Sequence, residues 1–240
     1  VTGASRGLGR AMAVALAEAG ADVGLLARSK DDLEETAAAI RAVGRRAVTL
    51  PADVTRAEEV GRAVEEARAA LGRLDIVVNN SGIAVVKPLV DTTPEDWRAV
   101  LETNLTGTYT VCRAVGPALI AGRAGKIINV ASILGARGLA GYTAYSASKG
   151  GIIAFTRALA VEWARHNVQV NAIAPGWFVT PMNAGAFADD RIRERLLRDV
   201  PARRPGRAEE LGPLVVYLAS SASDYMTGEV VYLDGGHAAG

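Results

Sequence analysis

A tyrosine and a lysine stand four residues apart in the stretch YTAYSASKGG, which spans residues 142–151. If this stretch is helical, Tyr145 and Lys149 lie on one face, because positions i and i+4 are neighbours on a helix. An ammonium close to a phenol favours the phenolate and lowers the pKa of the phenol. A phenol tuned in this way can protonate a carbonyl oxygen or deprotonate an alcohol. Tyr142 is two turns from Lys149, about 10 Å along the axis, so Tyr145 is the candidate acid/base.

A serine at the end of an apolar segment extends this chemistry. Ser132 ends the segment KIINVAS, whose apolar run is typical of a buried strand. At the carboxyl edge of a sheet, its hydroxyl can orient the carbonyl that Tyr145 protonates. Taken alone, Tyr145 and Lys149 are better interpreted as ordinary surface residues of a helix. Their combination with Ser132 and a glycine-rich segment at residues 2–9 favours a catalytic site.

That glycine-rich segment, TGASRGLG, precedes an alanine-rich helical stretch. Its glycines allow the backbone to turn tightly and to approach a pyrophosphate, which then rests on the helix N-terminus. The spacing is G-x3-G-x-G rather than the commoner G-x-G-x-x-G, so an ordinary turn is the alternative. The strand–turn–helix context favours dinucleotide binding. Because Val1 opens directly onto the turn, we expect the residues of the preceding strand to lie before residue 1.

The end of the next predicted strand indicates which dinucleotide is bound. Sites that hold a free ribose 2′-hydroxyl often place an acidic residue there. Here the segment LLARS carries Arg28 and no acid at its tip, and Arg6 lies in the glycine-rich segment. Two guanidinium groups suit a 2′-phosphate, whereas two solvated surface arginines are the alternative. We therefore expect NADP(H) in preference to NAD(H).

Composition limits the other classes of function. The chain has 240 residues, half of them hydrophobic, which suits one α/β domain with a sizeable core. The net charge of +1 does not point to nucleic acid or an acidic membrane surface as a partner. One cysteine, Cys112, and two histidines, His166 and His237, argue against a metal centre built from these residues and fit a reducing, cytoplasmic compartment. No apolar run approaches the roughly 20 residues that span a bilayer.

Helical and strand-like segments alternate from end to end and must position these residues. Continuous apolar strands between helices indicate a parallel sheet that is covered on both faces. We expect one doubly wound Rossmann-type α/β domain over residues 1–240, with ligands beyond the carboxyl ends of the strands. Capping boxes are expected at Ser29 and Thr55, and a helix start at Thr93, before Pro94. Strands are expected at 21–27, 47–50, 75–78, 126–130, 168–174 and 229–233, with helices between them, including a long one through residues 105 and 111 and another over 145–165.

At this point the chain resembles the short-chain dehydrogenase/reductase family over nearly all of its length. TGASRGLG is similar to the cofactor loop of the family, and Asp53 with Val54 to its adenine contact. Residues 79–82, NNSG, are similar to its NNAG motif, with Ser81 where alanine is usual. The cofactor-binding residues expected from these observations and the resemblance are Gly3, Ser5, Arg6, Gly7, Leu8, Gly9, Arg28, Asp53, Val54, Asn80, Gly82, Tyr145, Lys149, Pro175, Gly176 and Thr180.

The same resemblance implies a catalytic tetrad of Asn104, Ser132, Tyr145 and Lys149. In the family, the asparagine holds a water in a proton relay with the lysine, and the lysine also binds the nicotinamide ribose. On its own, Asn104 is better interpreted as a helix-surface amide. The resemblance further implies about seven strands in the order 3-2-1-4-5-6-7 and a homotetramer.

Residues 181–207 lose the core-like pattern and are similar to the lid that covers the substrate in this family. Basic residues outnumber acidic ones in this segment, which suggests an anionic or carrier-bound substrate; a solvated helix face is the alternative. The basic residues are Arg191, Arg193, Arg195, Arg198, Arg203, Arg204 and Arg207.

The function implied by the resemblance is an NADP(H)-dependent oxidoreductase that acts on a small carbonyl compound or secondary alcohol. The segments PGWFVTPM and SSASDYMTGEVVYLDGG are similar to those of gluconate 5-dehydrogenases and 3-oxoacyl-carrier-protein reductases. The substrate is therefore expected to be a 3-oxoacyl thioester or a keto-sugar acid. A catalytically silent NADP(H)-binding regulatory protein is the alternative, and the intact tetrad speaks against it.

Overall fold

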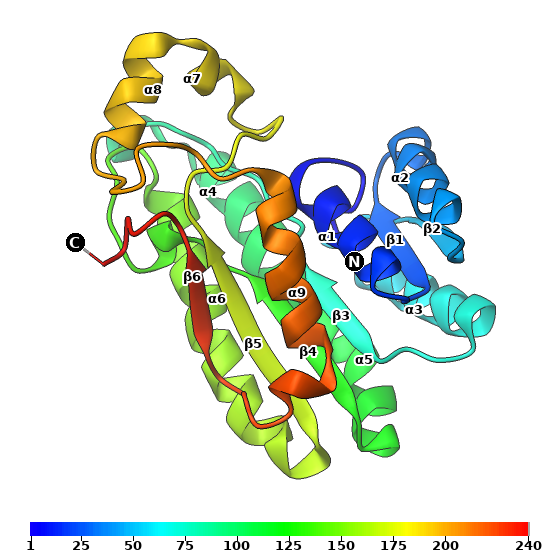
Figure 1. The fold of residues 1–240 in the computed structure, drawn as a ribbon. Helices are drawn as coiled ribbons and strands as arrows, with labels where there is room; N and C mark the ends of the chain where they lie inside the picture. Colours follow the sequence, from blue (N-terminus) through cyan, green and yellow to red (C-terminus); the bar gives the residue numbers. More distant parts are fainter. Residues whose placement is uncertain (240) are drawn as a thin grey trace.

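Helices and parallel strands alternate along the chain in the computed structural model, which describes residues 1–239 (Figure 1). The strands are β1 (Val23–Ala27), β2 (Ala47–Pro51), β3 (Ile76–Asn79), β4 (Gly125–Val130), β5 (Val168–Pro175) and β6 (Val230–Leu233). The α-helices are α1 (Gly7–Glu18), α2 (Lys30–Ala42), α3 (Ala57–Leu71), α4 (Pro94–Leu101), α5 (Gly107–Gly122), α6 (Thr143–Trp163), α7 (Ala184–Ala188), α8 (Asp190–Leu197) and α9 (Gly212–Ala219). Short helical turns are η1 (Leu89–Asp91), η2 (Glu102–Thr106), η3 (Ile133–Gly135), η4 (Ala164–His166), η5 (Ala208–Leu211) and η6 (Ser221–Ser223).

The strands pair in parallel as β1–β2 and as β3–β4–β5–β6. Only Val1 and Thr2 run between β1 and β3: the amide of Leu26 donates to the Val1 carbonyl at 2.9 Å, and the amide of Thr2 donates to the Val78 carbonyl at 2.9 Å. The resulting order confirms the predicted doubly wound Rossmann sheet, with six strands in the described residues instead of about seven. The number of strands differs because only Val1 and Thr2 occupy the position between β1 and β3 in the sheet. They lie beside a cavity of about 420 Å³. A further strand there stays a prediction.

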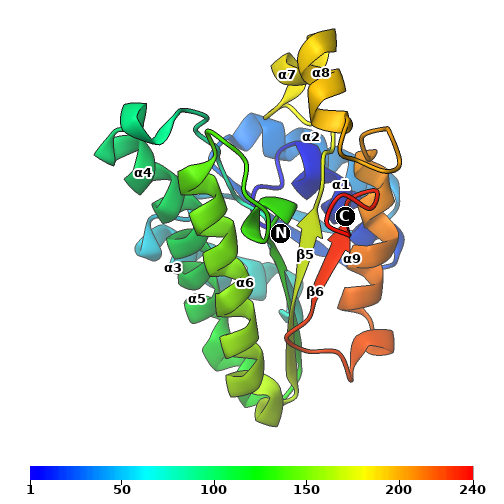
Figure 2. The same cartoon turned by 90° about the vertical axis from the view of Figure 1, so that its left-hand side faces the viewer.

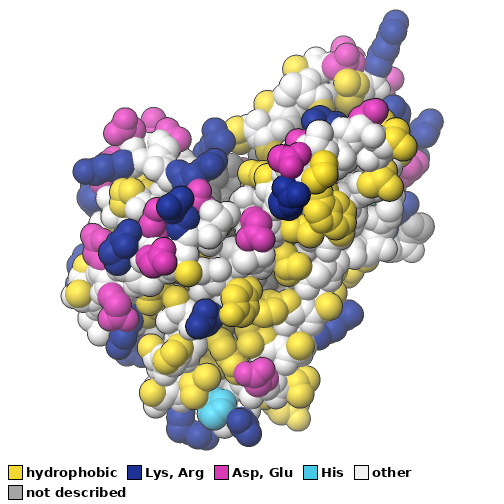
Figure 3. Space-filling model, turned by 180° about the vertical axis from the view of Figure 1, so that it is seen from behind, with side chains coloured by type: hydrophobic (Ala, Val, Ile, Leu, Met, Phe, Trp, Pro, Cys, Tyr) yellow, Lys and Arg dark blue, Asp and Glu magenta, His cyan; other side chains and the backbone are white. Residues whose placement is uncertain are grey.

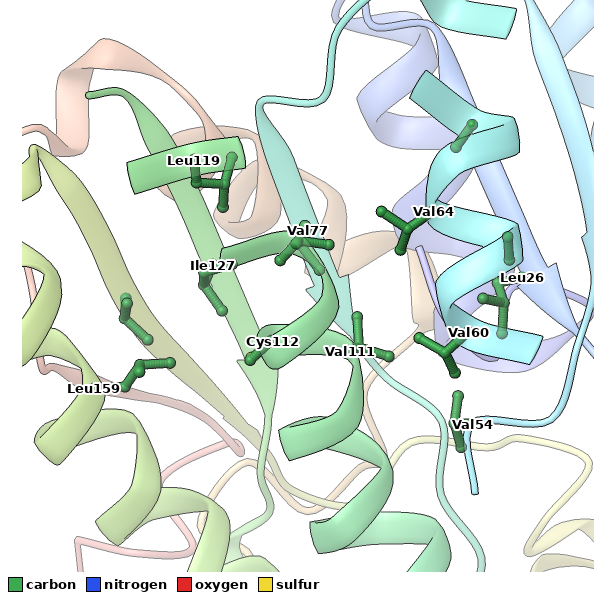
Figure 4. Packing of buried hydrophobic residues seen from close by; sticks show 14 of the residues in the cluster. Leu26, Val54, Val60, Val64, Val77, Val111, Cys112, Leu119, Ile127 and Leu159 are labelled. Atoms are coloured by element: carbon green, nitrogen blue, oxygen red, sulfur yellow. The ribbon is translucent and has the colours of Figure 1, made fainter. Parts of the chain in front are cut away.

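Two helical layers enclose the sheet. Helices α3, α5 and α6 cover one face, and α1, α2 and α9 cover the other (Figure 2). On the first face, side chains of α3 and α5 meet those of β3 and β4 (Figure 4). Every residue of β4 and β5 is buried, which explains their nearly continuous apolar sequences.

The helix starts follow the sequence signals at two of three places. The helix start predicted at Ser29 is confirmed, but only half of the predicted capping box forms, because the Ser29 hydroxyl accepts from the Asp32 amide and no return bond from the Asp32 side chain is present. Thr93 forms a capping box in front of Pro94. The capping box predicted at Thr55 is wrong. Helix α3 begins two residues later, because the Thr55 amide and hydroxyl instead donate to the Asp53 carboxylate, each at 2.9 Å.

The long helix expected through residues 105 and 111 is interrupted. Helices α4 and α5 are joined by η2, a π-helical turn that contains Asn104. Such turns are rare and occur frequently at functional sites. Beyond the carboxyl ends of the strands, α7 and α8 stand over the molecule (Figure 1); that residues 181–207 act as a lid stays a prediction. Within the described residues no helix is both long and apolar enough to span a membrane.

Candidate active site

The four predicted tetrad residues come from three places at the carboxyl edge of the sheet. Ser132 lies two residues after the last residue of β4 and caps η3, where its hydroxyl accepts from the Leu134 amide at 3.1 Å. Tyr145 and Lys149 lie on α6, which packs against η3 so closely that a Cβ on Gly135 would stand 2.8 Å from the Lys149 backbone. This tight approach fixes Ser132 relative to the two α6 side chains.

Lys149 is a buried lysine with an exposed fraction of 3%. Its ammonium donates to the carbonyl oxygen of Val130 at 2.6 Å and lies 5.6 Å from the centre of the Tyr145 ring. Burial lowers the pKa of Lys149 to about 8, because it penalises the charged form. A proton on this lysine is therefore exchangeable close to neutral pH.

The phenol of Tyr145 shows the opposite shift. Burial raises the pKa of Tyr145 to about 12, and the hydrogen bond with Ser132 opposes that rise without cancelling it. The sequence predicts that Lys149 lowers the pKa of Tyr145. In this structure the effect of burial is larger, so the pKa of Tyr145 is raised. Tyr145 is consequently protonated at neutral pH and is ready to act as an acid.

Asn104 is fully buried, so its interpretation as a helix-surface amide is wrong. Its side chain accepts from the Ile83 amide at 2.8 Å and donates to the Ile83 carbonyl at 3.0 Å and to the Ser148 hydroxyl at 2.9 Å. A Cβ on Gly82 would stand 3.3 Å from the Asn104 carbonyl oxygen and 3.6 Å from the Lys149 nitrogen. Asn104 and Lys149 thus flank the same point of the loop after β3.

The glycine-rich segment forms a loop that β3 supports. Gly3 and Gly7 adopt left-handed φ angles of 62° and 58°, and a Cβ on Gly9 would collide with the Gly3 carbonyl. The Asn80 amide nitrogen donates to the carbonyls of Thr2 and Gly3 at 3.1 and 3.2 Å. Helix α1 starts at Gly7 without a side-chain cap, so its first amides remain available to an anion.

Around this loop lie the other predicted cofactor residues. The Thr180 side chain is 3.7 Å from where a Cβ on Gly7 would stand, which places the segment after β5 against the loop. Arg6 and Arg28 are exposed at its rim. Burial alone would raise the pKa of Asp53, but hydrogen bonds from Thr55 and the nearby charge of Arg28 bring it below its ordinary value. The structure places the remaining members of the predicted set, Ser5, Leu8, Val54, Pro175 and Gly176, in these same segments.

Aromatic rings connect the predicted acid to the segment above it. The Tyr142 ring lies edge-on to Tyr145, with centroids 6.2 Å apart, and edge-on to Trp177 at 6.4 Å. Trp177 in turn meets Phe187 of α7 at 6.4 Å, and its indole nitrogen is buried without a hydrogen-bond partner. The contact between Trp177 and Phe187, ten residues further along the chain, has no signal in the sequence.

Comparison with known proteins identifies the family of the chain. The family model described as "Enoyl-(Acyl carrier protein) reductase" matches residues 3–238. The chain belongs to the short-chain dehydrogenase/reductase family. The predicted family and the predicted class of enzyme, an oxidoreductase that acts on CH–OH or C=O groups, are confirmed.

Relatives of this short-chain dehydrogenase/reductase include members of the two expected groups. It is 37% identical to the 3-oxoacyl-(acyl-carrier-protein) reductase FabG of Staphylococcus epidermidis, over 98% of this chain and 96% of the relative. It is 38% identical to the 2-dehydro-3-deoxy-D-gluconate 5-dehydrogenase of Escherichia coli, over 98% of this chain and 93% of the relative. A gluconate 5-dehydrogenase of Burkholderia cenocepacia, solved in complex with NADP and tartrate, superposes with a TM-score of 0.95 at 36% identity, covering 100% of this chain and 94% of that one.

Proposed function

We propose that this enzyme transfers a hydride between NADP(H) and the carbon of a carbonyl group or secondary alcohol. The observation that carries the proposal is the convergence of Ser132, Tyr145 and Lys149 beside the glycine-rich loop at one edge of the sheet. The loop fits a dinucleotide, because a Cβ on Gly9 would not fit against the Gly3 carbonyl and the first amides of α1 have no side-chain cap. NADP(H), when bound, supplies or accepts the hydride.

The protein groups handle the proton and the orientation of the substrate. Tyr145 donates a proton to the substrate oxygen during reduction and takes it back during oxidation. The Ser132 hydroxyl holds that oxygen next to the phenol. Lys149 keeps a positive charge near the phenol below about pH 8, which favours the developing phenolate. Lys149 also binds the nicotinamide ribose in this proposal, and Asn104, in η2, supports the site by holding Ile83 in the loop after β3.

The proposed preference for NADP(H) over NAD(H) is based on two arginines at the edge of the glycine-rich loop. Arg6 and Arg28 are both exposed and cationic, and Arg28 is close enough to Asp53 to lower the pKa of that carboxyl. Guanidinium groups are well matched to a phosphate on the ribose, whereas Asp53, whose carboxylate accepts from Thr55, would contact the adenine end. The NADP complex of the Burkholderia cenocepacia relative supports the same choice.

A substrate with a negative charge is the second part of the proposal. Within the described residues Arg195 of α8 makes no ion pair, unlike its neighbours Arg193 and Arg198. Its charge acts on Tyr142, where it opposes the rise in pKa that burial causes. A carboxylate or phosphate between Arg195 and Tyr142 would place the rest of the substrate toward Tyr145. The position of Arg195 leads us to favour a keto-sugar acid, whereas the relatives include both gluconate dehydrogenases and 3-oxoacyl-(acyl-carrier-protein) reductases.

NADPH consumption against a small panel tests both parts. The panel holds 5-keto-gluconate, an acetoacetyl thioester and a neutral aryl ketone. We expect the fastest turnover with 5-keto-gluconate. Turnover of the thioester alone would reassign the substrate, and bound NADPH without turnover of any ketone would favour the regulatory protein instead.

We also propose that the enzyme is a homotetramer. On the face formed by α4, α5 and α6, hydrophobic side chains reach the surface (Figure 3), including Tyr109 and Val161, which are 47% and 82% exposed. On the opposite side of the molecule Tyr217 and Tyr225 are exposed as well. Two separate apolar surfaces suit two kinds of subunit contact. Light scattering coupled to gel filtration gives the mass directly, and a monomer would contradict the proposal.

A further inference from the structure

One hydroxyl joins the catalytic helix to the loop after β3. Ser148 is fully buried on α6, between Tyr145 and Lys149. It donates to the Tyr145 carbonyl oxygen at 2.7 Å and accepts from the Asn104 amide nitrogen at 2.9 Å. A hydroxyl has a single proton, so the bond to Tyr145 fixes its orientation and turns a lone pair toward Asn104.

The Asn104 side chain is in turn held in one orientation. Both protons of its amide nitrogen are used, one by the Ile83 carbonyl and one by Ser148, while its oxygen accepts from the Ile83 amide. Turning the amide over would set its oxygen against the Ile83 carbonyl and its nitrogen against the Ile83 amide. Ser148 is therefore the partner on α6 that completes the hydrogen bonding of a fully buried amide.

This chain of bonds ends at Ile83, next to the residue of the loop that lies beside Lys149. The Asn104 side chain forms hydrogen bonds with the amide and with the carbonyl of Ile83. A Cβ on the preceding residue, Gly82, would lie close to both the Asn104 side-chain oxygen and the Lys149 nitrogen. The loop at Gly82 thus covers one side of the buried ammonium. If Asn104 loses its bond to α6, the loop is free to move away from Lys149.

We propose that Ser148 is a positioning residue that, through Asn104, holds the loop at residues 82–83 against Lys149. The consequence for catalysis rests on the proposed function, whereas the positioning itself does not. Ser148 touches no reacting atom in this proposal and acts only through the groups that it orients.

Ser148→Ala is the direct test, and Ser146→Ala is its matched control. The Ser146 hydroxyl is also buried on α6 but has no hydrogen-bond partner, so its loss removes no bond. We expect Ser148→Ala to lower kcat by about tenfold, the size expected for one lost hydrogen bond, with NADPH binding unchanged. The pKa of Lys149 should move from about 8 toward 10.5 as water reaches it. Ser146→Ala should leave kcat and that pKa as they are.

A second variant separates hydrogen bonding from space filling. Ser148→Cys keeps a group of similar size whose thiol is a weak donor and acceptor. We expect it to resemble Ser148→Ala, whereas a site that needs only to be filled would give wild-type behaviour. Wild-type kcat and wild-type pH dependence in both variants would overturn the proposal.

A double-mutant cycle shows whether Ser148 acts through Asn104. In an Asn104→Ala background, Ser148→Ala should have no further effect on kcat, since the residue it orients is gone. An undiminished effect in that background would overturn the route through Asn104.

One readout remains if the proposed function fails and no ketone is turned over. The chain has four lysines, so the carbon-13 resonance of Lys149 in labelled protein can be assigned with a Lys149→Arg variant and titrated directly. A Lys149 pKa that moves upward in Ser148→Ala but not in Ser146→Ala supports the positioning role without any assay of activity. An unchanged value in Ser148→Ala contradicts it.

Discussion

The ammonium nitrogen of Lys149 lies 5.6 Å from the ring centre of Tyr145, yet burial moves the pKa values of the two groups in opposite directions. It lowers the pKa of Lys149 to about 8 and raises that of Tyr145 to about 12. Below pH 8 both groups therefore carry their protons. That is the state needed to reduce a carbonyl, because the phenol can donate and the ammonium can stabilise the phenolate that remains.

The first prediction concerns the Tyr145 hydroxyl. Tyr145→Phe keeps the ring and its contact with Tyr142 but removes the acid, so we expect kcat to fall by about 10²–10⁴-fold. The dissociation constant for NADPH, measured by fluorescence titration, should stay near the wild-type value. Tyr217→Phe is the control, because that tyrosine is exposed on α9, away from the site. Retained turnover in Tyr145→Phe would exclude the proposed acid.

The second prediction concerns stability at alkaline pH. The folded state lowers the pKa of Lys149 from 10.5 to about 8, so the unfolded chain binds more protons between these values. This penalty amounts to about 3 kcal/mol below pH 8 and disappears as the pH rises toward 10.5. Lys149→Met lacks it, so we expect the variant to gain stability relative to wild type at pH 7 and to lose that advantage between pH 8 and pH 10. Urea unfolding of both proteins at several pH values measures the difference, and a difference independent of pH would contradict the pKa shift.

Helix α6 shows most clearly which features of the site can be predicted from the sequence and which cannot. The spacing of Tyr145 and Lys149 predicts a shared helix face because helix geometry is local. Apolar runs between helices predict a parallel sheet, whereas its strand order comes from the resemblance to the family. The role of Ser148 is not predictable in this way: its bond to Asn104 joins residues 44 positions apart, and nothing local marks that serine over Ser146. The direction of the Tyr145 shift was missed for a related reason, since burial depends on every segment that covers the phenol.

The third prediction concerns the backbone of the glycine-rich loop. Gly9→Ala would drive a methyl group into the Gly3 carbonyl and the Asn80 side chain. We expect the loop to open and the affinity for NADPH to fall by about tenfold or more. Gly61→Ala is the control: it lies inside α3 with nothing within 4 Å of the added Cβ, and it should stabilise the protein by roughly 0.5–1 kcal/mol. Titration with NADPH and thermal unfolding measure both variants, and normal NADPH binding by Gly9→Ala would exclude this loop as the pyrophosphate site.

The fourth prediction separates the two dinucleotides. Arg28→Asp replaces a cation at the end of β1 with the acid that suits a free ribose 2′-hydroxyl. We expect the dissociation constant for NADPH to rise by about tenfold, while that for NADH changes by less than about twofold. Arg62→Asp makes the same change of charge on the exposed side of α3 and should alter neither. Equal losses for NADPH and NADH in Arg28→Asp would remove Arg28 from the 2′-phosphate site.

The fifth prediction concerns Arg195 and the charge of the substrate. If its guanidinium binds a carboxylate beside Tyr142, Arg195→Ala should raise KM for 5-keto-gluconate by about tenfold and leave kcat nearly unchanged, because the contact is the same in the ground state and in the transition state. KM for a neutral aryl ketone should not change. Arg193→Ala tests for a general effect of the arginines on α8, since that residue lies on another side of the helix and pairs with Asp190. Equal changes in KM for the anionic and the neutral substrate would show that Arg195 affects the structure of α8 and does not bind the negative charge of the substrate.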